Sequence, residues 1–160
     1  MPDTIRQQIV DRFESKLQSI ATGAGYQTNV GQSVHEWRSS PFMQNELPAL
    51  IWRDLDEPVE EHTRFAQRHQ RALHMQVEIV GSGTTSPAEY RKLLADVEKA
   101  IKSGQLEDGT WWADENGEGL ALRTRPRMSR LVVEQESLKI AGGFYECFID
   151  YVTRDFDQYI

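Results

Sequence analysis

The sequence predicts an α+β protein in which a mixed, mostly antiparallel sheet of about five strands carries two helices on one face. Three observations lead to this prediction. Two segments repeat apolar residues at helical spacing, one near the start of the chain and one in its middle. Runs with strand-like patterning precede and follow the second of these segments. The length of 160 residues fits one domain, which we place over residues 1–160.

The first expected element is a helix over Ile5–Ala21. Asp3 is expected to cap its start, and Gly23 stands where a left-handed residue would end it. The apolar stripe recurs every three or four residues and consists of Ile5, Ile9, Phe13, Leu17 and Ile20. The other face of this segment is polar, which is typical of a helix that packs on one side.

Two strands are expected next. Residues 22–31 are small and glycine-rich, which indicates a loop, and residues 33–38 read as a short strand. Pro48 opens a second, mostly apolar strand over residues 49–53. The charged residues 54–70 are interpreted as a solvated loop between strands.

The middle of the chain contains the clearest strand and the clearest helix. Residues 73–80 alternate apolar and polar side chains, which predicts a half-buried strand. Ser86 and Glu89 then form a capping box around Pro87, and a helix is expected from there to Gly104. Its apolar stripe consists of Tyr90, Leu93, Leu94, Val97, Ala100 and Ile101.

The last third of the chain is expected to be a loop and two strands. Residues 105–119 are interpreted as a long acidic loop, and residues 120–134 as a strand interrupted by Pro126. Residues 143–153 carry apolar groups at both odd and even positions. A strand with two apolar faces is expected in the centre of the sheet or covered on both sides.

Composition limits the classes of function. The formal net charge is −7, and an acidic chain repels phosphate, so direct nucleic-acid recognition is not expected. No stretch approaches the ~20 apolar residues of a membrane span. Residues 1–13 lack the apolar core of a signal peptide. We therefore expect a soluble, cytoplasmic protein with no membrane partner.

Motifs of catalysis or cofactor binding do not occur in the sequence. The single cysteine, Cys147, excludes a disulfide within the chain and is expected to be a buried, inert thiol. His62 and His69 lack ligand-pair spacing and are interpreted as surface histidines. No nucleophile elbow and no complete phosphate-binding loop is present. We therefore expect no catalytic, cofactor-binding or metal site, and the protein is predicted not to be an enzyme.

The charges of the last third are segregated. Residues 107–118 contain only acids among their charged residues, namely Glu107, Asp108, Asp114, Glu115 and Glu118. Asp114, Glu115 and Glu118 could bind a divalent cation weakly, but they lack the regular spacing of a calcium-binding loop and are interpreted as solvated. Residues 123–130 contain only bases, namely Arg123, Arg125, Arg127 and Arg130. A chain with one acidic and one basic side suits a head-to-tail contact between copies.

Three of these arginines, at positions 123, 125 and 127, share one face of an extended strand. They repel one another unless acidic groups lie opposite. The acid could belong to the same chain, to the acidic loop of a neighbouring copy, or to a phosphate backbone. A solvated edge strand that is protected by its charges is the simplest alternative.

The adjacent Trp111 and Trp112 bear on the same surface. Two neighbouring tryptophans on a polar loop do not easily both point inward, and an exposed tryptophan is a typical interface anchor. Alternatively, the loop folds back and both rings cover the edge of the sheet. The candidate interface comprises Arg123, Arg125, Arg127, Arg130, Trp111, Trp112, Asp114, Glu115 and Glu118.

The layout of nearly the whole chain resembles the tail terminator, or tail-completion (minor tail), proteins of long-tailed bacteriophages and prophages. The resemblance rests on the order of these segments: the helix 5–21, the run 48–52 leading into the acidic turn 54–57, the alternating strand 71–79, the helix 88–101 and the last strand ending at residues 151–155. The segment 111–119 matches no feature of the family.

The resemblance implies an α+β structural protein of the virion that has no catalytic residues. It would form a homohexameric ring on the head-proximal end of the tail tube, stop tube polymerisation and present a surface to the head–tail connector proteins. Its partners would be its own copies, the tail tube protein and the connector. Its location would be the virion tail, and the cytoplasm of the bacterial host during assembly. Two alternatives stay open: another joining protein of the phage neck, and a small-molecule-binding domain with a pocket beside Trp111 and Trp112.

Overall fold

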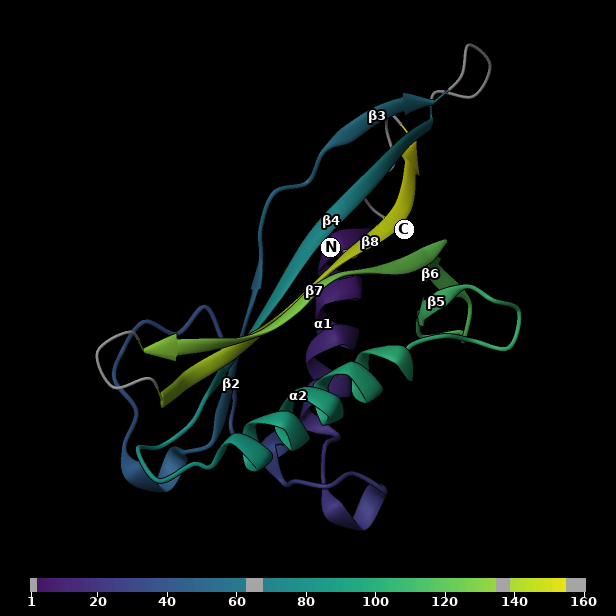
Figure 1. Ribbon diagram of the computed structural model, residues 1–160. Helices are drawn as coiled ribbons and strands as arrows, with labels where there is room; N and C mark the ends of the chain where they lie inside the picture. Colours follow the sequence, from purple (N-terminus) through teal and green to yellow (C-terminus); the bar gives the residue numbers. More distant parts are fainter. Residues whose placement is uncertain (1–2, 63–67, 135–138, 155–160) are drawn as a thin grey trace.

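The computed structural model describes residues 3–62, 68–134 and 139–154 (Figure 1). The helices are α1 (Ile5–Gln18) and α2 (Pro87–Lys102). The strands are β1 (Val34–Glu36), β2 (Ala49–Asp54), β3 (Val59–His62), β4 (Arg68–Val80), β5 (Trp111–Ala113), β6 (Gly119–Ala121), β7 (Arg123–Glu134) and β8 (Lys139–Arg154). Short 3-10 turns occupy Thr22–Ala24, Val30–Gln32 and Gln44–Glu46.

The main sheet has the strand order β1-β2-β4-β8-β7, and β3 pairs with the outer end of β4. β1 runs parallel to β2, whereas the other neighbours are antiparallel. β5 and β6 form a separate hairpin. The predicted α+β class with a mixed, mostly antiparallel sheet is therefore confirmed. The predicted central position of the last strand is confirmed as well, because β8 lies between β4 and β7.

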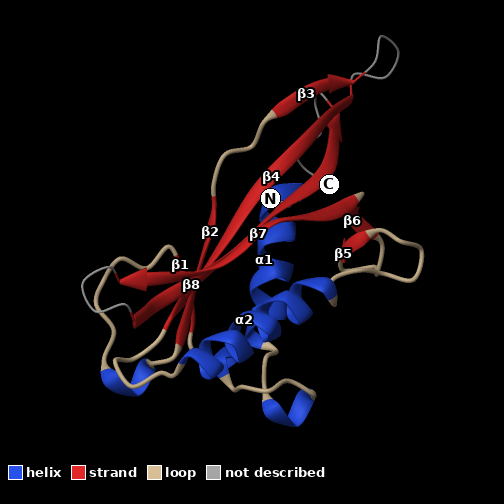
Figure 2. Ribbon diagram, in the orientation of Figure 1, coloured by secondary structure: helices blue, strands red, loops and turns tan. Residues whose placement is uncertain are grey.

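Both helices lie on one side of the sheet (Figure 2), where they bury alternate residues of the central strands. From β4 this core receives Leu73, Met75, Val77 and Ile79, and from β8 it receives Tyr145, Cys147, Ile149 and Tyr151. Cross-strand pairs such as Met75 with Cys147 place these residues on the same face. In the described part of the chain no helix covers the opposite face, which we call the open face.

The first helix is shorter than the sequence predicts. Thr4, not Asp3, is the N-cap, since its hydroxyl accepts a hydrogen bond from the Gln7 backbone N–H at 3.0 Å. The helix ends at Gln18 rather than near Gly23, and Ser19 caps it by donating from its hydroxyl to the Lys16 carbonyl at 2.6 Å. Local side-chain caps thus set both ends.

The second helix begins as predicted. The Ser86 hydroxyl accepts from the Glu89 backbone N–H, and the Glu89 carboxylate accepts from the Ser86 N–H, at 3.2 and 3.0 Å. The predicted capping box is therefore confirmed. Neither helix of the described residues has the length and apolar composition that crossing a membrane requires.

Two segments expected as loops contain strands. β3 lies within 54–70, and its backbone pairs with the start of β4 at one end of the sheet, far from α2 (Figure 1). Residues 63–67 of this predicted loop lie outside the described residues, as does Asp155 of the last predicted strand. β5 and β6 lie within or at the end of 105–119, and β7 follows β6 after one residue. These strands are too short or too charged to show the apolar alternation by which strands are recognised.

Candidate interaction surface

The pairing of β7 with β8 positions the arginines on the open face. Arg123 is the direct partner of Asp150, Arg125 of Phe148, and Arg130 of Phe144. Because side chains alternate along a strand, Phe144, Phe148 and Asp150 all point away from the helices. The four arginines of β7, namely Arg123, Arg125, Arg127 and Arg130, are called the arginine layer below.

Asp150 binds the first two members of the arginine layer. Its side chain has no exposed surface, and it accepts from the Nε atoms of both Arg123 and Arg125. Arg125 also donates from Nη2 to the second carboxylate oxygen at 2.8 Å. Burial disfavours the charged carboxylate, but the hydrogen bonds from the two arginines hold the pKa of Asp150 below its ordinary value.

Arg127 reaches the same face through an irregularity in the strand. The register of β7 shifts between Pro126 and Met128, which is the interruption that the sequence indicates at the proline. Arg127 donates to Glu146 on β8 at 3.1 Å and contacts the His74 ring on β4 at 3.2 Å. Burial raises the pKa of Glu146, but hydrogen bonds from Gln76 and His74 outweigh it, and the pKa is lowered.

Two phenylalanines support the arginines from below. The guanidinium groups of Arg125 and Arg127 lie 5.1 and 5.7 Å from the ring centre of Phe148. Arg130 lies 5.1 Å from the ring centre of Phe144. The side chains of Arg123, Arg125 and Arg127 still expose 60%, 45% and 46% of their surface. The layer is therefore held in place by buried acids and rings, yet it remains accessible.

Of the alternatives for the acidic partner, the structure shows an acid of the same chain. Asp150 and Glu146, not the acidic segment 107–118, face the arginines. β7 is also the last strand of the sheet order, so the description of these residues as an edge-strand face holds as well. Sequence reasoning did not use Glu146, Asp150 or His74. These three polar residues alternate with the apolar residues of β8 and β4, and this alternation indicates that they share the face opposite the core.

The acids of 107–118 are organised by local turns. The Asp114 carboxylate accepts from the backbone N–H groups of Asn116 and Glu118, both at 2.8 Å, inside the β5–β6 turn. Asp108 accepts from the Thr110 hydroxyl and backbone, and these hydrogen bonds lower its pKa. Glu115 and Glu118 are exposed. Among the described residues no group of three or more acids, histidines or cysteines is arranged to hold a metal.

The two tryptophans have different environments. Trp112 is only 1% exposed, and its Nε1 donates to the Thr124 hydroxyl at 2.9 Å, while its ring lies 5.5 Å from that of Phe13. The expectation of an exposed anchor is therefore wrong for Trp112. A positive φ of 58° turns this residue inward although it follows Trp111 directly. Trp111 stays half-buried.

A groove lies beside Trp111, between α2 and the edge strand β7. Its volume is about 480 Å³. It is lined by Glu98, Ile101, Lys102, Gln105, Trp111, Thr124, Pro126, Arg127, Met128, Ser129 and Tyr145. The sequence placed a possible pocket beside Trp111 and Trp112, and only Trp111 lines it.

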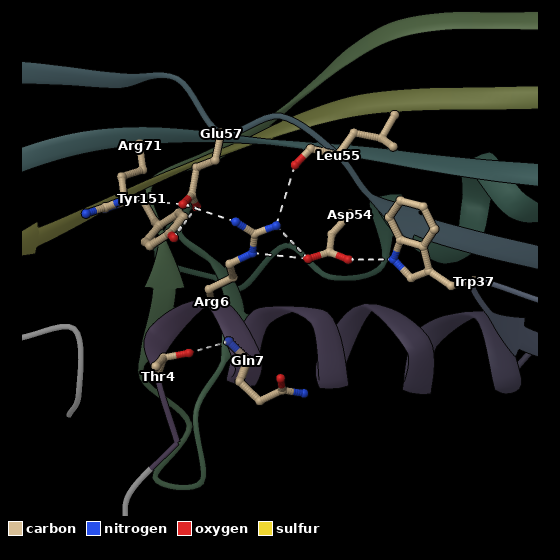
Figure 3. Close-up of polar contacts among 9 residues, drawn as sticks. All are labelled: Thr4, Arg6, Gln7, Trp37, Asp54, Leu55, Glu57, Arg71 and Tyr151. Atoms are coloured by element: carbon tan, nitrogen blue, oxygen red, sulfur yellow. Dashed lines mark hydrogen bonds and ion pairs between the residues drawn. The ribbon is translucent and has the colours of Figure 1, made fainter.

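A second polar cluster joins α1 to the sheet (Figure 3). Arg6 donates from Nη2 to Asp54 at 2.6 Å and from Nη1 to Glu57 at 3.3 Å. Glu57 also accepts from Arg71 at 3.3 Å and from the Tyr151 hydroxyl. Every charge in this cluster faces an opposite charge, and its residues hold the N-terminal helix in place. We therefore assign it to stability.

Comparisons with known proteins give no match: no protein-family model fits the chain, and no curated protein sequence is similar to it.

Proposed function

We propose that this chain is a structural assembly protein resembling phage tail terminators. It would form a ring that caps the tail tube, stops its polymerisation and provides the head-joining surface. The observation that carries the proposal is the arginine layer. Ion pairs within the chain hold this basic surface in position on the open face, although the net charge of the chain is −7. A basic patch on an acidic protein attracts acidic protein surfaces, including those of its own copies.

The charge balance of the layer favours an intermolecular contact. Four arginines of β7 face two acids of β8, so positive charge is left over on the open face. Exposed carboxylates, among them Glu115 and Glu118, lie in the β5–β6 turn of the same chain. Two different patches that complement each other give a head-to-tail contact, and such a contact forms a ring when the rotation from copy to copy closes.

The structure also indicates which arginine to change. Arg123 and Arg125 neutralise the buried Asp150, so reversing either charge would damage the fold. Arg130 is exposed and rests on Phe144, which makes Arg130→Glu the better variant. Arg91→Glu on the exposed side of α2 is the matched control, because it makes the same charge change away from the layer.

The test is light scattering on a sizing column over a range of protein and salt concentrations, with and without purified tail tube protein. We expect six times the chain mass of 18.4 kDa, or a discrete complex with the tube protein. Arg130→Glu and high salt should weaken assembly, and Arg91→Glu should not. Binding to a portal protein instead of the tube would favour another neck protein. A monomer under every condition contradicts the proposal.

A further inference from the structure

The outer edge of β7 has no neighbouring strand among the described residues, and a groove lies beside it, against α2. β7 ends the strand order of the main sheet over twelve residues, Arg123–Glu134. Three of its residues that face the helix side, Thr124, Pro126 and Ser129, are small, and the next one, Leu131, packs against the core. The partners of the three small residues on β8 are Ile149, Cys147 and Tyr145. The helix side of the edge strand is therefore poorly filled, which leaves the groove of about 480 Å³ against α2.

The lining of the groove combines apolar and charged residues. Apolar and aromatic surface comes from Ile101, Trp111 and Tyr145. Glu98 and Lys102 of α2 add charged side chains. A volume of this order suits a buried apolar group that is held by a few polar contacts.

We propose that β7 takes up an extended peptide segment of a partner protein as an additional strand, and that this segment alternates apolar and acidic residues. Side chains of an added strand point alternately to the two faces of the sheet. Those on the helix side enter the groove, where Ile101, Trp111 and Tyr145 provide apolar surface. Those on the open face come beside the arginine layer, where Asp150 and Glu146 leave positive charge uncompensated.

The same arrangement explains why the edge selects its partner. Charged residues, a proline and a bulge are devices that keep an edge strand from pairing indiscriminately, and β7 has all three. An acidic strand is attracted by the arginines, whereas a neutral or basic strand is not. The inference does not rest on ring formation, because one copy of the chain contains both the groove and the arginine layer.

The probe is a fluorescent heptapeptide of alternating sequence, Asp-Leu-Asp-Phe-Asp-Leu-Asp, and binding is measured by anisotropy on dilute protein. We expect saturable binding. Two control peptides should bind about tenfold more weakly or worse. One has the same composition with its apolar residues grouped together, and the other has lysine in place of aspartate.

Two variants test whether the peptide binds in the groove and beside the arginine layer. Ser129→Trp fills the groove and should reduce affinity about tenfold, while Ser15→Trp, an exposed serine of α1, should not. Arg130→Gln should weaken binding of the aspartate peptide. Circular dichroism checks that each variant is folded. If Ser129→Trp does not fold, Gln105→Trp serves the same purpose, since Gln105 is exposed and lines the groove.

Three results would overturn the proposal. The grouped peptide could bind as tightly as the alternating one, which would mean simple charge attraction. N-acetyl-phenylalanine amide alone could bind as tightly, which would mean a small-molecule pocket. No saturable binding of the alternating peptide up to millimolar concentration would mean that the edge does not accept a strand. Each result can occur whether or not the chain forms a ring, so failure here is separate from failure of the proposed function.

Discussion

Asp150 and Arg125 form a two-point ion pair in which the carboxylate is fully buried while 45% of the arginine side chain stays exposed. The pair joins the edge strand β7 to the central strand β8. Its asymmetry separates two roles. The aspartate holds the arginine in one orientation, and the exposed part of the arginine adds positive charge to the open face.

Replacing Asp150 tests the first role. Asp150→Asn removes the negative charge beneath Arg123 and Arg125, and we expect the free energy of unfolding at pH 7 to fall by about 1–3 kcal/mol. Urea unfolding followed by circular dichroism measures it. Asp11→Asn, an exposed carboxylate of α1, is the control and should change little.

The pH dependence of the same variant gives an independent readout. Because the pKa of Asp150 is lowered in the folded state, its contribution is present above the ordinary pKa of about 4 and is lost as pH falls through the folded pKa. The wild-type protein should therefore lose more stability between pH 7 and pH 3 than Asp150→Asn does. Equal losses would show that the ion pair does not contribute to stability.

The sequence predicted the arginine face but not its partners, and the reason is physical. The spacing of Arg123 and Arg125 follows from strand geometry alone. Asp150 lies opposite Arg123 because of the register between β7 and β8, and these two residues are 27 positions apart in the sequence. The register shifts twice along these strands, at Pro126/Met128 and at Val132/Val133, and no local pattern in the sequence gives the sizes of the two shifts.

The environment of Trp112 was missed for a related reason. Its burial depends on a positive φ, a conformation that a tryptophan rarely adopts and that packing against Phe13 stabilises. By contrast, α2 was predicted almost to the residue. Its capping box and apolar stripe are local features, and the core confirms them.

Gly104 tests the packing of Trp112. A Cβ atom at this position would lie 2.8 Å from the Trp112 ring, whereas a Cβ at Gly83 would meet nothing within 4 Å. We expect Gly104→Ala to lower the free energy of unfolding by about 1–3 kcal/mol through overpacking. Gly83→Ala should be neutral or slightly stabilising. Equal effects in urea denaturation would contradict the described contact between Gly104 and Trp112.

Asp96 tests how the loop after α1 is fixed. It is 2% exposed on α2 and accepts from the backbone N–H groups of Gln27 and Thr28, at 2.8–3.1 Å, and from the Thr28 hydroxyl. Asp96→Ala leaves these donors without an acceptor, at a cost of about 1–3 kcal/mol. Hydrogen exchange should speed up at Gln27 and Thr28 but not in β8. Unchanged exchange at these two amides would mean that Asp96 does not fix the loop after α1.

Tyr151 tests the cluster that holds α1 on the sheet (Figure 3). The Tyr151 hydroxyl donates to Glu57, which also accepts from Arg6 and Arg71. Tyr151→Phe removes one of these donors, so we expect a modest loss of about 1 kcal/mol in thermal or urea unfolding. Tyr26→Phe, at a half-buried tyrosine beside Lys99, is the control. A loss no larger than that of the control would mean that the arginines alone satisfy Glu57.

Cys147 tests the position of β8 in the sheet. The thiol is fully buried opposite Met75, and burial raises its pKa, so the reactive thiolate is both rare and inaccessible in the folded protein. We expect a thiol reagent at pH 8 to leave the native protein unlabelled and to modify one thiol per chain in urea. The labelled fraction should rise along the unfolding curve measured by circular dichroism. Rapid labelling without denaturant would mean that β8 opens locally, and the surface built on Glu146 and Asp150 would then open with it, because both residues belong to the same strand.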